Sequence, residues 1–344
     1  MLITSSTPKF NPGEIVAAAS DAIKLNLGVN VQHPHPLASE LGMASVAYAL
    51  GYQQRVPQEW EIDRAVMARG MATADFSRIL ADGISGVAFH SYSEASEHKR
   101  FAKSIELRDF RPTGWPGVGT DLELELAGEG GEITYGYARL VAGSVLLKLS
   151  TYARAICVSR QAIMNDQFGA IKQVFSDIGA SAARVEARLV AEALENPAVL
   201  DDGNPVFDAG YKNVVASALN DASLAVGMSY LRMQLTPSGH PAGLRAEHLI
   251  VAADLEFQAL RLVQDTGVNI RVTVLTGLPE GRWYLTSNPE AHPTIVTTRL
   301  QGTNSAVRVE GAKRPFGFDG TAVRVIADLG AAVVRRDGII RGGL

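Results

Sequence analysis

The 344-residue sequence has only one cysteine, Cys157, so it can form neither an intrachain disulfide framework nor a zinc site made of cysteines alone. The cysteine lies in the apolar run AICVS, and we expect it to be buried as a small hydrophobic residue. Long hydrophobic runs are also missing, since no stretch approaches the ~20 apolar residues of a membrane span. The first residues, MLITSSTPKFNPGEI, lack the charged-then-apolar order of a signal peptide. We therefore expect synthesis and retention in the cytoplasm, unless a larger assembly carries the protein out.

Motifs of catalysis and cofactor binding are absent as well. The sequence contains no G-x-S-x-G, H-E-x-x-H or C-x-x-C pattern, and no G-x-x-x-x-G-K followed by Ser or Thr. The glycines of GWPGVG are interrupted by Pro116 and lead into a predicted strand, unlike a dinucleotide-binding loop. The acidic stretch DDGNPVFD lacks the ligand spacing and the terminal glutamate of a calcium loop. We therefore predict no catalytic, cofactor-binding or metal-binding residues.

Three polar residues, His90, Glu94 and His98, recur at every fourth position. On a continuous helix they would share one face and could bind a metal ion. Lys99 and Arg100 follow directly, which favours a solvated polar surface instead. The other histidines are scattered, with no paired nucleophile or carboxylate that would indicate a catalytic triad.

Charge and composition are moderate. Hydrophobic residues make up 47% and charged residues 20%, which is typical of a soluble globular protein, and the length suffices for roughly two domains. The net charge is −4 and the sequence pI about 6.0, which argues against a general nucleic-acid-binding protein with a clustered basic face. Such a charge would still suit a wall that encloses nucleic acid without gripping it.

The N-terminal part predicts helices without an independent core. Up to about Tyr52, short apolar runs alternate with glycine and proline, which indicates a partly helical arm that is ordered by its contacts. WEIDRAVMARG has the pattern of a helix closed by Gly70. Thr73 can cap a second helix, ADFSRILADGISGVAF, whose apolar residues recur at three- and four-residue spacing.

An extended region follows, and its centre predicts a β-hairpin. In DLELEL, leucines alternate with acidic residues, which is the period of a half-buried strand. AGEGG is a glycine-rich turn, after which ITYGY returns along the first strand. Because a lone hairpin is marginal in water, its apolar face must pack on the protein's own sheet or on another copy. The candidate inter-subunit contacts are its apolar side chains: Leu122, Leu124, Leu126, Ile133, Tyr135 and Tyr137.

The clearest element is a long helix after the polar junction RQAIMND. Asn165 or Asp166 can cap it, and Pro197 ends it after Glu195. At ~1.5 Å per residue, its roughly thirty residues span about 45 Å, which is long for a single compact domain. The stretch GASAA in its middle would let a neighbouring sheet approach closely. The predicted apolar stripe comprises Ile171, Val174, Phe175, Ile178, Ala182, Val185, Leu189 and Ala193.

After Pro197 the pattern is that of a compact α/β unit. SLAVGMSYLRMQL and DLEFQALRLVQD predict helices, the second capped by Asp254. HLIVAA, NIRVTVLTGL, RWYLTSN and TIVTTRL predict strands. The last stretch returns to extended structure in AVRVEG and TAVRVIADLGAAVV, with ADLG as a turn before AAVV.

Taken in order, these segments resemble the major head subunit of Mu-like phages and prophages, within the wider Hong Kong 97-type capsid family of tailed bacteriophages. The matching stretches begin with ATADFSRILADGISGVAFHSY and RFAKSIELRDFRP, and continue through GEGGEITYG, TYARAICVSRQAIMNDQFGAI and SAARVEARLVAEALENP. They end with DDGNPVFDAGYKN and FGFDGTAVRVIADLGAAVVRRDGIIRGG. The likeness covers about residues 60–344 and is weakest over 240–310.

The resemblance implies an α+β, Hong Kong 97-type capsid fold. The implied role is a major capsid protein that self-assembles as pentamers and hexamers into an icosahedral shell around the double-stranded DNA of a tailed phage. The implied segments are an N-terminal arm (1–60), the helical N-terminal part of the peripheral region (61–108), an extended loop formed by the hairpin (109–159), a peripheral domain with its spine helix (160–200), an axial α/β domain (201–305) and the C-terminal strands of the peripheral domain (306–344).

The implied partners are other copies of the chain, a portal, a scaffold and decoration proteins, with DNA enclosed without sequence-specific binding and no membrane contact. The implied location is the virion, after assembly in the cytoplasm of a bacterial host. An encapsulin-type compartment shell, which shares this fold, is the alternative interpretation. An enzyme of unknown class is the least favoured, because no catalytic motif supports it.

Overall fold

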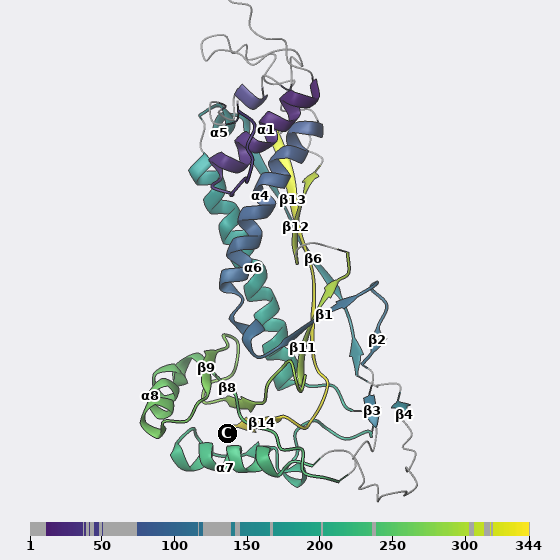
Figure 1. The fold of residues 1–344 in the computed structure, drawn as a ribbon, viewed down its shortest axis with the longest axis vertical. Coiled ribbons are helices and arrows are strands. Elements are labelled where there is room, and N and C mark those ends of the chain that lie inside the picture. The colour runs from purple at the N-terminus through teal and green to yellow at the C-terminus, as the bar shows by residue number, and fades with distance from the viewer. Residues whose placement is uncertain are drawn as a thin grey trace, which may run out of the picture. The chain divides into compact units, whose positions relative to one another are not determined.

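The computed structural model describes residues 12–36, 74–115, 117–119, 139–141, 145–165, 168–200, 202–235, 239–302, 306–312 and 319–343, together with positions 38, 41, 45–47, 50 and 317. The chain forms two compact units (Figure 1). The first comprises Met1–Ala95, Thr151–Ala183 and Thr303–Asp328, and the second comprises Ser96–Ser150, Arg184–Gly302 and Leu329–Leu344. Helix α6 (Phe168–Glu195) and strand β13 (Gly320–Val333) each supply residues to both units.

The first unit contains two helices that pack at a small residue. Helix α1 (Pro12–Asn26) lies against α4 (Ala74–Ala95), where a Cβ at Gly83 would collide with Ile23. Helix α4 also covers strand β12 (Val307–Ala312), which pairs with β13. The helix predicted from Ala74 is confirmed, and it continues beyond the predicted segment to Ala95.

Helix α6 approaches α4 at Gly179, where no side chain holds the two backbones apart. A Cβ at Gly179 would collide with the backbone carbonyl of Ala88 on α4. The stretch GASAA therefore admits a helix within the first unit, whereas we expected a sheet. The predicted apolar stripe of α6 is wrong in part, because Val174 is exposed and the buried face of the helix is rotated slightly from the predicted stripe. The buried positions of α6 are Ile171, Phe175, Gly179, Ala183, Glu186, Val190, Ala191 and Leu194.

The junction before α6 is itself a short helix. Helix α5 (Arg160–Met164) begins after Ser159, whose hydroxyl accepts a hydrogen bond from the Ala162 N–H (3.2 Å). Asn165 closes this short helix, and position 166, the other predicted cap of α6, lies outside the described residues. The 28-residue α6 ends at Glu195, as predicted.

The second unit is centred on a sheet whose described strands lie in the order β7–β14–β10–β8–β9. The strands HLIVAA, NIRVTVLTGL and RWYLTSN and the helices on either side of HLIVAA are confirmed. The element bounds are β7 (Val214–Val215), α7 (Asp221–Met233), β8 (His248–Val251), α8 (Glu256–Thr266), β9 (Arg271–Val274), β10 (Trp283–Thr286) and β14 (Ile339–Gly342).

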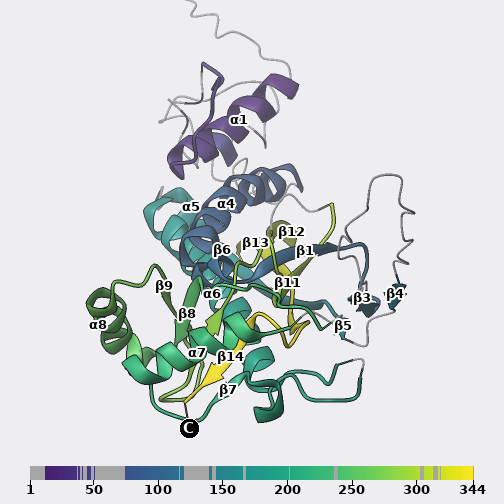
Figure 2. The ribbon, with the colours of Figure 1, turned by 60° about the horizontal axis from the view of Figure 1, so that its bottom comes forward.

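The two faces of this sheet are covered by different helices, because alternate strand residues point to opposite sides. Leu249 and Trp283 belong to the core that α7 and α8 cover (Figure 2). Ile250 and Tyr284 pack instead with the second-unit residues of α6. The Tyr284 hydroxyl lies 3.2 Å from the Leu194 carbonyl and 2.7 Å from a carboxylate oxygen of Glu195 and can donate to either, and burial raises its pKa above the ordinary value.

Strand β13 continues straight through ADLG, so the turn predicted there is wrong. A Cβ at Gly330, the glycine of ADLG, would collide with the Lys148 carbonyl, so this glycine permits a close backbone approach instead. The second-unit part of β13 pairs antiparallel with β11 (Ile295–Leu300), the confirmed strand TIVTTRL. Strand β11 pairs in parallel with β1 (Lys103–Leu107) on its other side.

Two further predictions are corrected. Cys157 is exposed rather than buried, because it lies on the face of β6 (Ser150–Ser159) that also carries the exposed Ala153 and Ala155. Asp254 does not cap α8, which follows a 3₁₀ turn (Ala253–Leu255); its carboxylate accepts a hydrogen bond from the Gly281 N–H (2.8 Å). The predicted helix WEIDRAVMARG and its Gly70 stop lie outside the described residues. The expected mixed α+β class is confirmed.

We predict opposite effects for the same substitution at two glycines of α6. Gly179→Ala places a Cβ against the Ala88 carbonyl and should lower the free energy of unfolding by about 1–3 kcal/mol, the usual cost of overpacking. Gly169→Ala meets nothing within 4 Å and should raise it by about 0.5–1 kcal/mol, because alanine is the better helix former. Thermal or urea unfolding of both variants measures the difference, and equal effects would contradict the close α4–α6 contact.

Candidate inter-subunit surfaces

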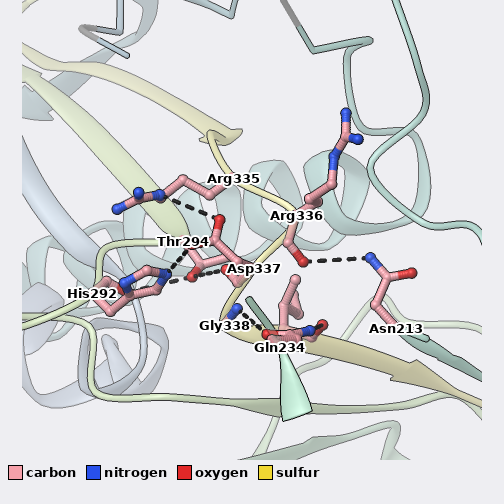
Figure 3. A network of polar contacts seen from close by, with 9 residues as sticks. Asn213, Gln234, His292, Thr294, Arg335, Arg336, Asp337 and Gly338 are labelled. Carbon is pink, nitrogen blue, oxygen red and sulfur yellow. Dashed lines mark hydrogen bonds and ion pairs between the residues drawn. The ribbon is translucent and has the colours of Figure 1, made fainter. Parts of the chain in front are cut away.

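The turn Arg335–Gly338, between β13 and β14, is held by side chains from distant segments of the second unit (Figure 3). The Gly338 N–H donates a hydrogen bond to the side-chain oxygen of Gln234 (2.6 Å). The side-chain amide of Asn213 donates to the Arg336 carbonyl (3.4 Å). Gly338 has a φ of +84°, and a Cβ there would collide with the surrounding side chains, so this position requires glycine.

Asp337 of this turn is a largely buried carboxylate between a histidine and an arginine. Its Oδ2 lies 2.8 Å from His292 Nε2, and its Oδ1 lies 3.4 Å from Arg335 Nε. Burial alone would raise the pKa of the Asp337 carboxyl, but the contact with His292 and the charge of Arg335 outweigh burial, and the pKa lies below its ordinary value. Asp337 is therefore ionised at neutral pH, and its charge stabilises the turn.

Arg336 binds the loop DDGNPVFD from the other side of the turn. Its Nη2 lies 2.6 Å from Asp202 Oδ1, and its guanidinium lies 4.2 Å above the Tyr211 ring. The hydrogen bond from Arg336 lowers the pKa of Asp202 to about 2. This acidic loop therefore pairs with an arginine. Among the residues that the structure describes, no group of three His, Cys, Asp or Glu side chains is placed to hold a metal ion.

The histidines of the repeating pattern are separated by the end of α4. His90 and Glu94 lie on that helix, exposed and 3.3 Å apart, as a solvated surface requires. His98 follows the end of α4 and is buried, with its Nε2 2.9 Å from Glu186 Oε2, so the solvated interpretation is wrong for this residue. Glu186 is the one charged residue on the buried face of α6. A charge within an apolar helical stripe is the signal that could have predicted this pair.

Burial also affects the lysine beside this pair. Lys99 follows His98 directly, and desolvation lowers the pKa of its ammonium despite the opposing charge of Glu186. A buried hydrogen-bonded pair is costly to break, because removing one partner leaves the other polar group buried without a hydrogen bond. The contact joins the segment that follows α4 to α6 and has the character of a structural pair.

Helices α7 and α8 expose apolar side chains on the face opposite the sheet. Phe257 on α8 is 79% exposed, and Leu260, one turn later, is 52% exposed. Val226 and Met233 are exposed on α7. Phe257 and Leu260 are neighbours on one face of α8, and a contiguous exposed apolar patch of this kind marks a contact surface. The sequence DLEFQALRLVQD contains more apolar residues than one buried face can hold, and this excess is a signal that the sequence interpretation missed.

The extended region is described only at its base. Strand β3 (Gly117–Gly119) pairs antiparallel with β4 (Arg139–Val141), with Gly119 opposite Arg139. A second antiparallel pair joins β2 (Thr113–Gly114) and β5 (Leu146–Leu147), beside which Phe110 and Leu146 are exposed. The six predicted contact residues lie outside the described residues, so their contacts remain predictions: Leu122, Leu124, Leu126, Ile133, Tyr135 and Tyr137.

A comparison with protein families gives the class of this protein. The sequence model of a family described as phage capsid protein matches residues 142–342, which is more than half of the chain. The chain belongs to this family of phage capsid proteins. No curated protein matches the chain. Among the described residues, no helix is long and apolar enough to span a membrane.

Several solved structures are similar at low identity. The capsid of the cyanophage P-SCSP1u has 13% identity and a TM-score of 0.45, with 72% of this chain and 88% of that chain covered. A protein of Mycobacterium phage Adephagia has 12% identity and a TM-score of 0.46, with 74% and 89% covered. An encapsulin complex from Synechococcus elongatus has 12% identity and a TM-score of 0.47, with 71% and 85% covered. These likenesses are too distant to assign a function, so the assignment depends on the family match.

We predict that Glu186→Ala destabilises the protein by about 1–3 kcal/mol, because it leaves the His98 ring nitrogen buried without its hydrogen-bond partner. Glu192→Ala, on the exposed side of the same helix, should change the stability little. The free energies of unfolding from urea titration provide the comparison. Equal stability of the two variants would show that the buried pair contributes nothing.

We predict that Asp337→Asn removes part of the acid sensitivity of the protein. Because the folded pKa of Asp337 lies below its ordinary value, its carboxylate adds stability above about pH 4, and this contribution is lost as the pH falls through the folded pKa. The variant should be less stable than the wild type at neutral pH, and the difference should shrink as the pH falls below about 4. A difference in unfolding free energy that stays constant as the pH falls would contradict the prediction.

Proposed function

We propose that this chain is the major head protein of a Mu-like phage or prophage, with a Hong Kong 97-type fold. It self-assembles as pentamers and hexamers into an icosahedral shell that encloses double-stranded DNA. The observation that carries the proposal is the capsid-family match over residues 142–342. The exposed apolar faces of α7 and α8 support it, because a subunit that works alone would have little use for them.

In this proposal each segment has a mechanical role. Residues 1–60 form the arm, 61–108 the helical N-terminal part of the peripheral region, and 109–159 the loop that lies over a neighbour. Residues 160–200 carry the spine helix, with 201–305 as the axial domain and 306–344 as the strands that complete the peripheral domain. The antiparallel pair β3–β4 supports the loop assignment, because residues 120–138 connect two strands that already run side by side.

The proposed role needs no catalytic residue, cofactor or metal ion. The partners are other copies of the chain, a portal, a scaffold and decoration proteins, and the DNA is enclosed without sequence-specific contacts. The net charge of −4 suits a wall that does not adhere to DNA. The protein would reach the virion after assembly in the cytoplasm of the bacterial host.

An encapsulin-type compartment shell is the second candidate, since one of the similar structures is an encapsulin complex. The family match favours the phage head. Purified particles distinguish the two, because a phage head holds DNA and a portal whereas a compartment shell holds a cargo protein.

We predict that a subunit without the ribbon folds but does not close shells. Deleting Asp121–Tyr137 and replacing Thr120 and Ala138 with Asn and Gly leaves a two-residue turn between the paired Gly119 and Arg139. Electron microscopy should then show free subunits or open assemblies, while the unfolding temperature changes little. Glu129→Gln, at the predicted tip, is the control and should assemble like the wild type. Normal closed particles from the deletion would contradict the role of the ribbon.

A further inference from the structure

Strand β6 (Ser150–Ser159) has one hydrogen-bonded edge and one edge without a partner among the described strands, which we call its open edge. Contacts at both ends show that it runs antiparallel to β13: the Arg160 N–H donates to the Asp319 carbonyl (3.0 Å), and the Thr151 hydroxyl donates to Asp328 Oδ1 (2.6 Å). Among the described strands it pairs only with β13, which Figure 1 shows beside it in yellow. An open edge of this length presents a row of backbone groups that can pair with another strand.

The open edge has few of the features that prevent strand addition. Of its ten residues only Val158 is buried, and the strand contains no proline and no lysine. In an antiparallel pair, successive residues point their N–H and C=O groups alternately toward the partner strand and away from it. Counted from the Arg160–Asp319 bond, those of Ala153, Ala155 and Cys157 point away from β13, toward the open edge. Among the described strands, none pairs with these groups.

The two faces of β6 differ in a way that indicates the partner. One face carries only small side chains at its centre, Ala153, Ala155 and Cys157, and all three are exposed. The other face carries Arg154, which is exposed and has no polar partner among the described residues. A complementary strand would therefore carry large apolar residues on one face and acidic residues on the other.

We infer that the open edge of β6 receives the segment Asp121–Leu126 of a neighbouring copy as an added strand; this inference rests on the proposed self-assembly. The segment reads DLELEL, so its leucines would lie beside Ala153, Ala155 and Cys157, which leave room for them. Its acidic side chains would lie on the face of Arg154 and neutralise that charge. Directly opposed like charges are unfavourable, so two copies of β6 would pair poorly, since Arg154 lies at the middle of the strand.

The reach of the segment fits this partner. Residues 120–138 connect the paired Gly119 and Arg139, and half of that length extends about 30 Å at ~3.3 Å per residue. A hairpin of this size is marginal in isolation, and pairing with a further strand supplies the stabilisation that it lacks. Main-chain hydrogen bonds then hold the contact, and side chains set its register.

Cross-linking to the native cysteine tests the inference directly. Cys157 is the only cysteine of the chain, so one introduced cysteine reports a single pairing. In assembled protein oxidised with diamide, at least one of Leu122→Cys, Leu124→Cys and Leu126→Cys should give a ladder of disulfide-linked chains on a non-reducing gel, because adjacent strands meet the geometry of the bond. Glu123→Cys is the matched control. It lies on the other face and should give no ladder.

Each other result overturns the inference. A ladder from Glu123→Cys and from none of the leucine positions means that the segment docks with the opposite face. A dimer band from the unmodified protein means that β6 pairs with another β6. In a further outcome, electron microscopy shows closed particles while no variant gives a ladder. That result contradicts the β6 contact but not the proposed shell function. Absence of closed particles from the unmodified protein contradicts the proposed function itself.

A charge exchange provides a second measurement. Arg154→Glu places like charges together and should lower the yield of closed particles roughly tenfold, as a loss of about 1.4 kcal/mol per contact would do. Glu123→Arg should have a similar effect, and the double variant should recover most of the yield. Single variants that assemble like the wild type, or a double variant without recovery, would contradict the pairing of these two faces.

Discussion

The burial of one long helix, α6, is the constraint on which both units depend. In the first unit, Gly179 removes the side chain that would separate α6 from the α4 backbone. In the second unit, Val190 and Leu194 of the same helix belong to the core under the sheet. A single helix of 28 residues therefore supplies core side chains to both, and each unit requires a different part of its surface. Helix propensity alone would not stabilise such a helix, since most helical stability comes from packing.

Buried charges add specificity to this apolar framework. His98 and Glu186 form a pair within the second unit, and Asp337 lies between His292 and Arg335 in the turn before the last strand. Such groups are expensive to remove from water, and they penalise any packing that separates them. Both pairs join segments that are far apart in the sequence, and both therefore require the complete unit.

The surfaces that these cores leave uncovered explain why a capsid role suits the chain. Phe257 and Leu260 are exposed on α8, and β6 has an open edge with small exposed side chains. A closed symmetric assembly covers such surfaces with neighbouring copies and spreads its binding energy over large interfaces. The buried polar groups described above connect structural elements.

The sequence by itself determined the elements whose signals are local and periodic. These include the helix ending at Glu195, the strand HLIVAA and the helix from Ala74, together with the ordered series of segments that indicated a capsid protein. Boundaries and faces were less certain: ADLG was interpreted as a turn, Cys157 as buried and Val174 as part of the core stripe. At ADLG a neighbour distant in sequence decides, because the Lys148 carbonyl lies where a side chain of residue 330 would stand. At Cys157 and Val174 the side chain is left exposed, which local periodicity does not determine. Only the tertiary structure places His98 against Glu186 and leaves one edge of β6 open, because burial and pairing depend on which segments meet, and local periodicity carries no record of that.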